Sequence, residues 1–132
     1  LKSLNPKLKI IGVSMDRGAA MYESQKAGKP IFVKEEESLA DALTGGIGLD
    51  NKHTFELTKE LVDDFVLVSE KEIAEGIYHA YWHESQIVEG AGAVAIAALL
   101  NNKFSPKGPS LALLCGKNIN MEKHFNLISA KK

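Results

Sequence analysis

Ile87-Val88-Glu89-Gly90-Ala91-Gly92-Ala93 is the stretch that decides the fold, because an apolar pair leads directly into a helix start made of small residues. A second stretch, Leu111-Ala112-Leu113-Leu114-Cys115-Gly116-Lys117-Asn118, is typical of a buried strand that ends on a thiol and a glycine. In open α/β sheets, ligands collect at the carboxyl ends of the strands. Together the two stretches predict one wall of a ligand pocket in a parallel α/β sheet.

The rest of the chain alternates strand-like apolar runs with helical segments. Runs typical of buried strands occur at residues 9–14, 65–68 and 110–114, and residues 31–33 predict a brief strand or extended segment. Helices are expected over residues 19–26, from Asp50 or Asn51 through Leu61, from a Ser69/Glu72 capping box to about Glu84, over 91–101 and over 122–128. This alternation implies right-handed crossovers and a parallel sheet covered on both faces. The predicted fold class is α/β, a three-layer α/β/α arrangement with a mostly parallel sheet, in one compact unit over residues 1–132.

The chain begins without a methionine, at Leu1, in a segment typical of the end of a helix. We therefore expect it to be part of a longer polypeptide, with a sheet that is incomplete because its N-terminal part is missing.

Composition excludes several classes of partner. Sixteen basic residues balance seventeen acidic ones, for a net charge of −1. The longest acidic run, Glu35-Glu36-Glu37, is expected in a solvated loop. Because the charges balance and neither sign forms a long run, neither nucleic acid nor an anionic membrane is an expected partner. No apolar stretch approaches the ~20 residues of a membrane span. The single cysteine cannot form an internal disulfide, which suits a reducing cytoplasm.

Two motifs have both a functional and an ordinary interpretation. Residues 90–95 match G-x-G-x-x-A, which can seat a dinucleotide pyrophosphate on a helix N-terminus, or can simply allow close packing at a tight turn. The acidic residue expected about twenty positions later is absent. His79 and His83 have a spacing that can grip a metal, but no third ligand is evident, and surface histidines of an amphipathic helix fit better.

Cys115 and Glu89 also keep two interpretations each. Cys115 is either a small core residue or a group that faces a ligand at the end of its strand. Glu89 either stabilises the helix that follows it through the helix dipole, or faces the same crevice as Cys115.

Five blocks in series carry a resemblance to a known family: Glu37-Ser38-Leu39-Ala40-Asp41-Ala42-Leu43, Gly46-Ile47-Gly48-Leu49, Leu61-Val62-Asp63-Asp64, Val88-Glu89-Gly90-Ala91-Gly92 and Cys115-Gly116-Lys117-Asn118-Ile119. Their order and spacing resemble the C-terminal portion of the catalytic domain of threonine/serine dehydratases. These are pyridoxal-phosphate lyases of the tryptophan-synthase-β-like fold type, a group that also includes serine racemase. The segment Met15–Met21 is most similar to the hydroxyectoine-utilisation dehydratase branch.

The resemblance implies three cofactor-binding residues. Cys115 stands where the family places a serine or cysteine against the pyridine nitrogen. Such a neutral partner makes the ring a weaker electron sink than an aspartate would, which suits β-elimination. Glu89 matches a family acid beside the ring. Ala42 matches a position, usually glycine, whose backbone lies near the cofactor.

Departures from the family pattern limit what the chain is expected to do. Ser14, Gly18 and Ala20 replace the cation ligands of the racemases, so we expect no metal there. Gly45 replaces a serine near the substrate carboxylate. The family's Schiff-base lysine and glycine-rich phosphate loop lie before the first residue of this sequence, and Lys117 does not stand at the lysine position. No catalytic residue is therefore predicted, and the polypeptide alone is expected to be inactive.

The resemblance implies part of a pyridoxal-phosphate-dependent ammonia-lyase that converts a hydroxy amino acid, such as threonine or serine, to a keto acid and ammonia. The expected partner is a small-molecule amino acid, the expected assembly is a homodimer of the intact enzyme, and the expected location is cytoplasmic. Two alternatives stay open: a non-catalytic α/β binding or regulatory module, and a nucleotide-binding domain that uses Gly90 and Gly92.

Overall fold

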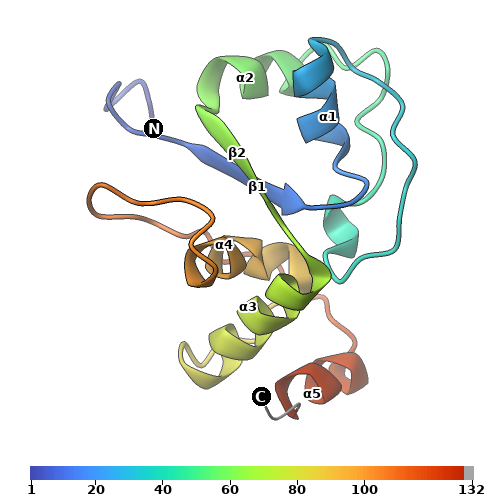
Figure 1. Cartoon of the computed structure of the whole chain (residues 1–132), viewed down its shortest axis with the longest axis vertical. Coiled ribbons are helices and arrows are strands. Elements are labelled where there is room, and N and C mark those ends of the chain that lie inside the picture. Colours follow the sequence, from blue (N-terminus) through green and yellow to red (C-terminus); the bar gives the residue numbers. More distant parts are fainter. Residues whose placement is uncertain (130–132) are drawn as a thin grey trace.

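A computed structural model describes residues 1–129 of the chain (Figure 1). Within these residues, two strands and five α-helices follow one another, with one short 3-10 helix, η1, between α1 and α2. In chain order they are β1 (Ile11–Met15), α1 (Ala20–Ala27), η1 (Asp41–Leu43), α2 (Thr54–Leu61), β2 (Asp64–Val68), α3 (Glu70–Trp82), α4 (Gly90–Leu100) and α5 (Met121–Ser129).

The sheet consists of β1 and β2, which pair in parallel with Ile11 opposite Asp64 and Met15 opposite Val68. The pairing extends before the strands, because Asp63 N donates to Ile10 O at 2.9 Å and Ile10 N donates to the Asp63 carboxylate at 2.7 Å. The two strands predicted from their apolar runs are thus confirmed, as is their parallel direction.

Helices lie on both sides of this sheet. Figure 1 shows α1 and α2 on one side and α3 and α4 on the other. On the first side, the Tyr22 ring of α1 meets the Phe65 ring of β2 edge-on, with centroids 6.0 Å apart. On the second side, α4 contacts both strands and α3. The predicted α/β class is confirmed, and these layers place the start of α4 near the carboxyl ends of the strands.

The core lies mostly between α3, α4 and the sheet, and small residues allow the two helices to approach closely. A Cβ added to Gly76 of α3 would lie 2.7 Å from Ala93 O and 3.2 Å from Ala97 Cβ. Apolar burial of this kind is the main favourable term in folding. Fully buried members of the cluster are Met15, Ala40, Val68, Ile73, Ile77, Ala80, Ala93, Ala97 and Ala98.

Local signals mark two helix starts: the α3 start is as predicted, whereas α2 begins at Thr54, after the cap predicted at Asp50 or Asn51. The Ser69 hydroxyl accepts from Glu72 N, and the Glu72 carboxylate accepts from Ser69 N at 2.7 Å, which completes the predicted capping box. Before α2, the Asn51 side chain accepts from Phe55 N at 3.0 Å. Each bond satisfies a backbone donor that the first helical turn leaves without a partner.

Helix α5 packs against α3. Trp82 Nε1 donates to Ile128 O at 3.0 Å, and the His124 ring meets the Tyr81 ring edge-on. His124 is only 1% exposed, and this burial lowers its pKa below the ordinary histidine value. Within residues 1–129, no helix combines the length and apolar character needed to cross a membrane.

The predicted strand over residues 110–114 is wrong. These residues lie outside any strand, and Leu111 and Leu113 are 83% and 71% exposed. A strand requires a neighbour with which to exchange backbone hydrogen bonds, and the sheet of the described residues holds only β1 and β2. The residues 31–33 likewise lie outside the sheet.

Replacing Gly76 with alanine tests the close approach of α3 and α4. The added methyl must push against a backbone oxygen, so the free energy of unfolding should fall by about 1–3 kcal/mol in urea denaturation. Gly108→Ala is the matched control, because an added Cβ there meets nothing within 4 Å. If Gly76→Ala lowers the free energy of unfolding no more than Gly108→Ala does, α3 and α4 are not in close contact at Gly76.

Candidate active site

The first turn of α4 lies between two other segments of backbone. A Cβ added to Gly90 would overlap Leu39 O, and one added to Gly92 would overlap Cys115 O. Both glycines are buried. Any side chain at either position would force the backbones apart, so the small residues of this helix start have a direct steric cause.

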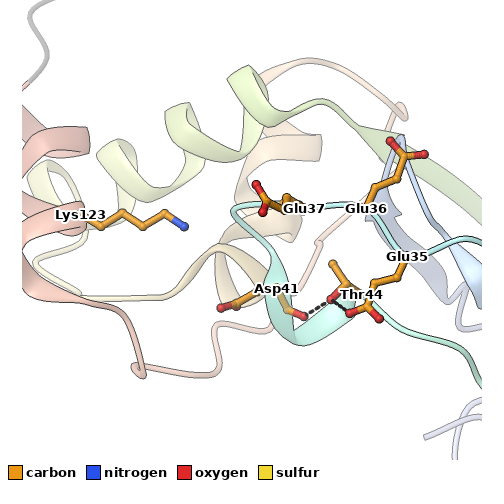
Figure 2. Close-up of a pocket in the computed structure, with 7 residues that line it drawn as sticks. Glu35, Glu36, Glu37, Asp41, Thr44 and Lys123 are labelled. Atoms are coloured by element: carbon orange, nitrogen blue, oxygen red, sulfur yellow. Dashed lines mark hydrogen bonds between the residues drawn. The ribbon is translucent and has the colours of Figure 1, made fainter.

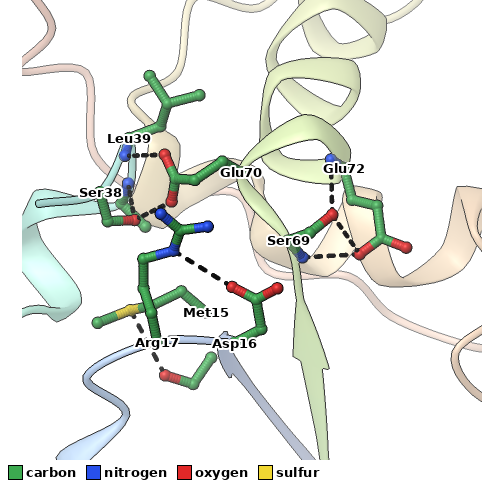
Figure 3. Close-up of polar contacts among 10 residues, drawn as sticks. Met15, Asp16, Arg17, Ser38, Leu39, Ser69, Glu70 and Glu72 are labelled. Carbon is green, nitrogen blue, oxygen red and sulfur yellow. Dashed lines mark hydrogen bonds and ion pairs between the residues drawn. The ribbon is translucent and has the colours of Figure 1, made fainter. Parts of the chain in front are cut away.

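On one side of α4 lies the loop of residues 38–40, which leads into η1. Glu70, the first residue of α3, holds this loop: its carboxylate accepts from Ser38 Oγ at 2.5 Å and from Leu39 N at 2.7 Å (Figure 3). Ala40 is fully buried and its N–H donates to Ser38 Oγ at 3.0 Å. The loop is therefore fixed before the chain reaches Ala42, which is exposed in η1.

On the other side of α4 lies the turn of residues 115–118, which Glu89 holds. Glu89 N donates to Gly116 O at 3.1 Å, and Asn118 N donates to the Glu89 carboxylate at 2.9 Å. Gly116 has φ of +79°, and a Cβ there would overlap the Glu89 carboxylate. Glycine is required at this position on both counts.

The three predicted cofactor-binding residues belong to segments that meet at the start of α4. Glu89 and the turn that contains Cys115 are in direct contact. Helix η1, which contains Ala42, contacts α4. The thiol of Cys115 is free and exposed, so the expectation that it ends a buried strand is wrong, for the reason given for residues 110–114.

Glu89 stands at the N-cap of α4, yet its side chain makes no capping hydrogen bond to the helix. The carboxylate instead accepts the N–H of Asn118, and its negative charge still lies beside the positive end of the helix dipole. This position agrees with the helix-dipole interpretation of Glu89, whereas its role beside a ligand stays a prediction. Its main contact is with the turn.

The geometry disfavours a pyrophosphate at Gly90 and Gly92. In dinucleotide-binding folds the fingerprint glycines leave the backbone open to phosphate. Here the space beside both glycines is filled by the chain's own carbonyl groups, and the segment before α4 is not a strand. The close-packing interpretation of the motif is the one that fits.

His79 and His83 stack with ring centroids 4.6 Å apart, and His79 Nε2 lies 3.5 Å from a Glu84 oxygen. In the described part of the chain, no three His, Cys, Asp or Glu side chains are grouped so as to hold a metal ion.

An acidic pocket of about 580 Å³ lies next to η1 (Figure 2). In Figure 2 the Lys123 amine points toward Glu37 and Asp41. Four carboxylates and one amine line this pocket, and this excess of negative charge would repel a phosphate group, so we place no ligand there. The residues that line it are Glu35, Glu36, Glu37, Ser38, Asp41, Thr44 and Lys123.

Sequence reasoning missed the role of Glu70 and Ser38. An acidic residue in the first turn of a helix is favoured by the helix dipole alone. The local sequence therefore gave no sign that Glu70 accepts a hydrogen bond from a loop residue 31 positions away.

Comparison with known proteins identifies the family of the chain. Residues 1–116 match the family described as "Pyridoxal-phosphate dependent enzyme". A putative threonine dehydratase of Sinorhizobium fredii is 56% identical over 130 residues, which are 98% of this chain and 39% of the relative. An L-threonine ammonia-lyase of Thermotoga maritima is 38% identical over 122 residues, which are 92% of this chain and 30% of the relative. The chain thus spans two fifths or less of the length of these curated relatives.

A solved structure shares the arrangement of elements. The processed form of threonine deaminase isoform 2 from Solanum lycopersicum superposes with a TM-score of 0.79 at 29% identity. The match covers 98% of this chain and 39% of that one.

Gly92→Ala tests the contact between α4 and the turn. Alanine favours a helix by up to about 1 kcal/mol over glycine, yet we expect the overlap with Cys115 O to lower the unfolding free energy by about 1–3 kcal/mol. The backbone amide resonances of residues 115–118 should shift in an ¹H–¹⁵N NMR spectrum. Gly46→Ala is the control, since an added Cβ there reaches only Gly48 N, at 4.0 Å. Unchanged resonances for residues 115–118 would mean that the turn does not rest on α4.

Proposed function

The chain belongs to the pyridoxal-phosphate dependent enzymes, and on this premise we propose that it forms one wall of the cofactor site of a threonine/serine dehydratase. Such an ammonia-lyase converts a hydroxy amino acid to a keto acid and ammonia. The names of the relatives support this class of reaction. The observation that carries the proposal is the meeting of three segments, which contain Ala42, Glu89 and Cys115, at the start of α4.

The residues present fit an aromatic cofactor. The Gly116 backbone packs directly against the Glu89 carboxylate, which fixes the turn, and the Cys115 thiol next to it is exposed and so accessible to a ring. When bound, pyridoxal phosphate supplies the electron sink for elimination. Cys115 would face the pyridine nitrogen as a neutral hydrogen-bonding partner. Glu89 would hold the turn and lie beside the ring, and the backbone at Ala42 would border it.

This wall is only part of a catalytic apparatus. The thiol, the carboxylate and the Ala42 backbone bind and orient the cofactor, whereas the amine that would capture it and move the substrate proton is no residue of this wall. We therefore assign no catalytic residue in this chain. The 132 residues by themselves are expected to be inactive.

Several finer features belong to the same proposal. The substrate is threonine, serine or, on the similarity of residues 15–21 to the hydroxyectoine-utilisation branch, a related hydroxy amino acid. The intact enzyme is a cytoplasmic homodimer that binds neither nucleic acid nor membranes. No divalent metal is used at Ser14, Gly18 and Ala20.

The test uses the complete gene product, reconstituted with pyridoxal phosphate and assayed for keto acid and ammonia from L-threonine and L-serine. Cys115→Ser keeps a neutral hydroxyl partner and should retain the activity. Cys115→Asp places a carboxylate there that favours a protonated pyridine nitrogen, and kcat should fall by about tenfold or more, a change of about 1.4 kcal/mol in the barrier. Cofactor uptake by both variants is followed from the visible absorbance band.

Two results would contradict the proposal. A gene product that takes up no pyridoxal phosphate would leave the non-catalytic module as the better assignment. Equal activity in the serine and aspartate variants would show that residue 115 does not contact the pyridine nitrogen.

A further inference from the structure

We propose that Glu70 is a positioning residue for the cofactor wall, acting through the loop of residues 38–40 rather than by touching the cofactor. The inference rests on the proposed function. It concerns a residue outside the three segments that border the site.

The contacts of Glu70 are directed at the loop. One carboxylate oxygen accepts from Ser38 Oγ at 2.5 Å and the other from Leu39 N at 2.7 Å. Ser38 Oγ in turn accepts from Ala40 N at 3.0 Å. Hydrogen bonds to an ionised carboxylate are among the stronger ones in proteins, so one side chain organises three successive residues.

The position of Glu70 is itself rigid. It is the first residue of α3, directly after the Ser69 cap, whose bonds to Glu72 fix the start of the helix (Figure 3). Glu70 and Glu72, in the same helical turn, thus make different contacts. Glu72 closes the cap on its own helix, and Glu70 reaches across to a segment 31 residues away in sequence.

The loop is held from its opposite side by α4. Leu39 O lies against Gly90, at the helix start that also supports the turn of Cys115. The N–H of Leu39 is bound to Glu70 while its carbonyl is set by α4, so the peptide planes on either side of Leu39 are both constrained. Ala42 follows three residues later in η1, so the position of its backbone depends on how the loop is held at Leu39.

The alternative role for Glu70 is a simple favourable charge at the N-terminus of α3. Glu70→Gln removes the charge and leaves one oxygen acceptor for two donors, so the loop loses a bond. Glu56→Gln is the matched control, because Glu56 is an exposed acidic residue in the first turn of α2.

The experiment uses the complete gene product and measures the dissociation constant of pyridoxal phosphate together with the circular dichroism of the bound cofactor's visible band. We expect Glu70→Gln and Ser38→Ala each to weaken cofactor binding by about tenfold and to change that band. The double variant should be no worse than Glu70→Gln, because both substitutions break one shared contact. Glu56→Gln should match the parent in affinity and band.

The outcomes separate the two proposals. If the parent binds no pyridoxal phosphate, the proposed function fails and this inference with it. If the parent binds it and the Glu70 and Ser38 variants match the parent in both readouts, only this inference is overturned. Should Glu70→Gln not fold, Ser38→Ala decides alone, since it removes one hydroxyl and keeps the charge.

Discussion

The contact on which the rest of the structure depends is the approach of two backbone segments to the first turn of α4. Gly90 meets the carbonyl of Leu39, and Gly92 meets the carbonyl of Cys115. Backbone atoms come this close to a helix only where side chains are absent. The sheet and the α3–α4 core hold α4 in place, and α4 holds both segments of the candidate site.

Two carboxylates stabilise these two segments by accepting a hydrogen bond from a backbone N–H group. Glu70 accepts the N–H of Leu39 from the first turn of α3, and Glu89 accepts the N–H of Asn118 from the N-cap of α4. Each binds a backbone donor of a loop that has no regular secondary structure to satisfy it. Sterically close backbones and charge-assisted bonds thus act together, and the exposed thiol of Cys115 is positioned through its neighbours rather than through contacts of its own.

Much of this could be predicted from the sequence, because the signals are local. The apolar runs that became β1 and β2, the Ser69 capping box and the small-residue start of α4 each follow from short-range rules. Residues 110–114 satisfied the same rules and form no strand. A strand needs a neighbouring strand with which to exchange backbone hydrogen bonds, and a short apolar segment does not specify that neighbour. Glu70 was missed for the related reason that its partner lies far away in sequence. The roles of Ala42, Glu89 and Cys115 toward a cofactor stay a prediction.

The most direct measurement of the central claim is amide hydrogen exchange at Asn118. This residue is exposed and lies outside any helix or strand, so without its bond to Glu89 its amide would exchange as in an unstructured peptide. The account predicts that it exchanges at least about tenfold more slowly than that reference. Exchange at the unstructured rate would show that the turn is not held against α4, and the assembly of the three segments into one wall would be contradicted.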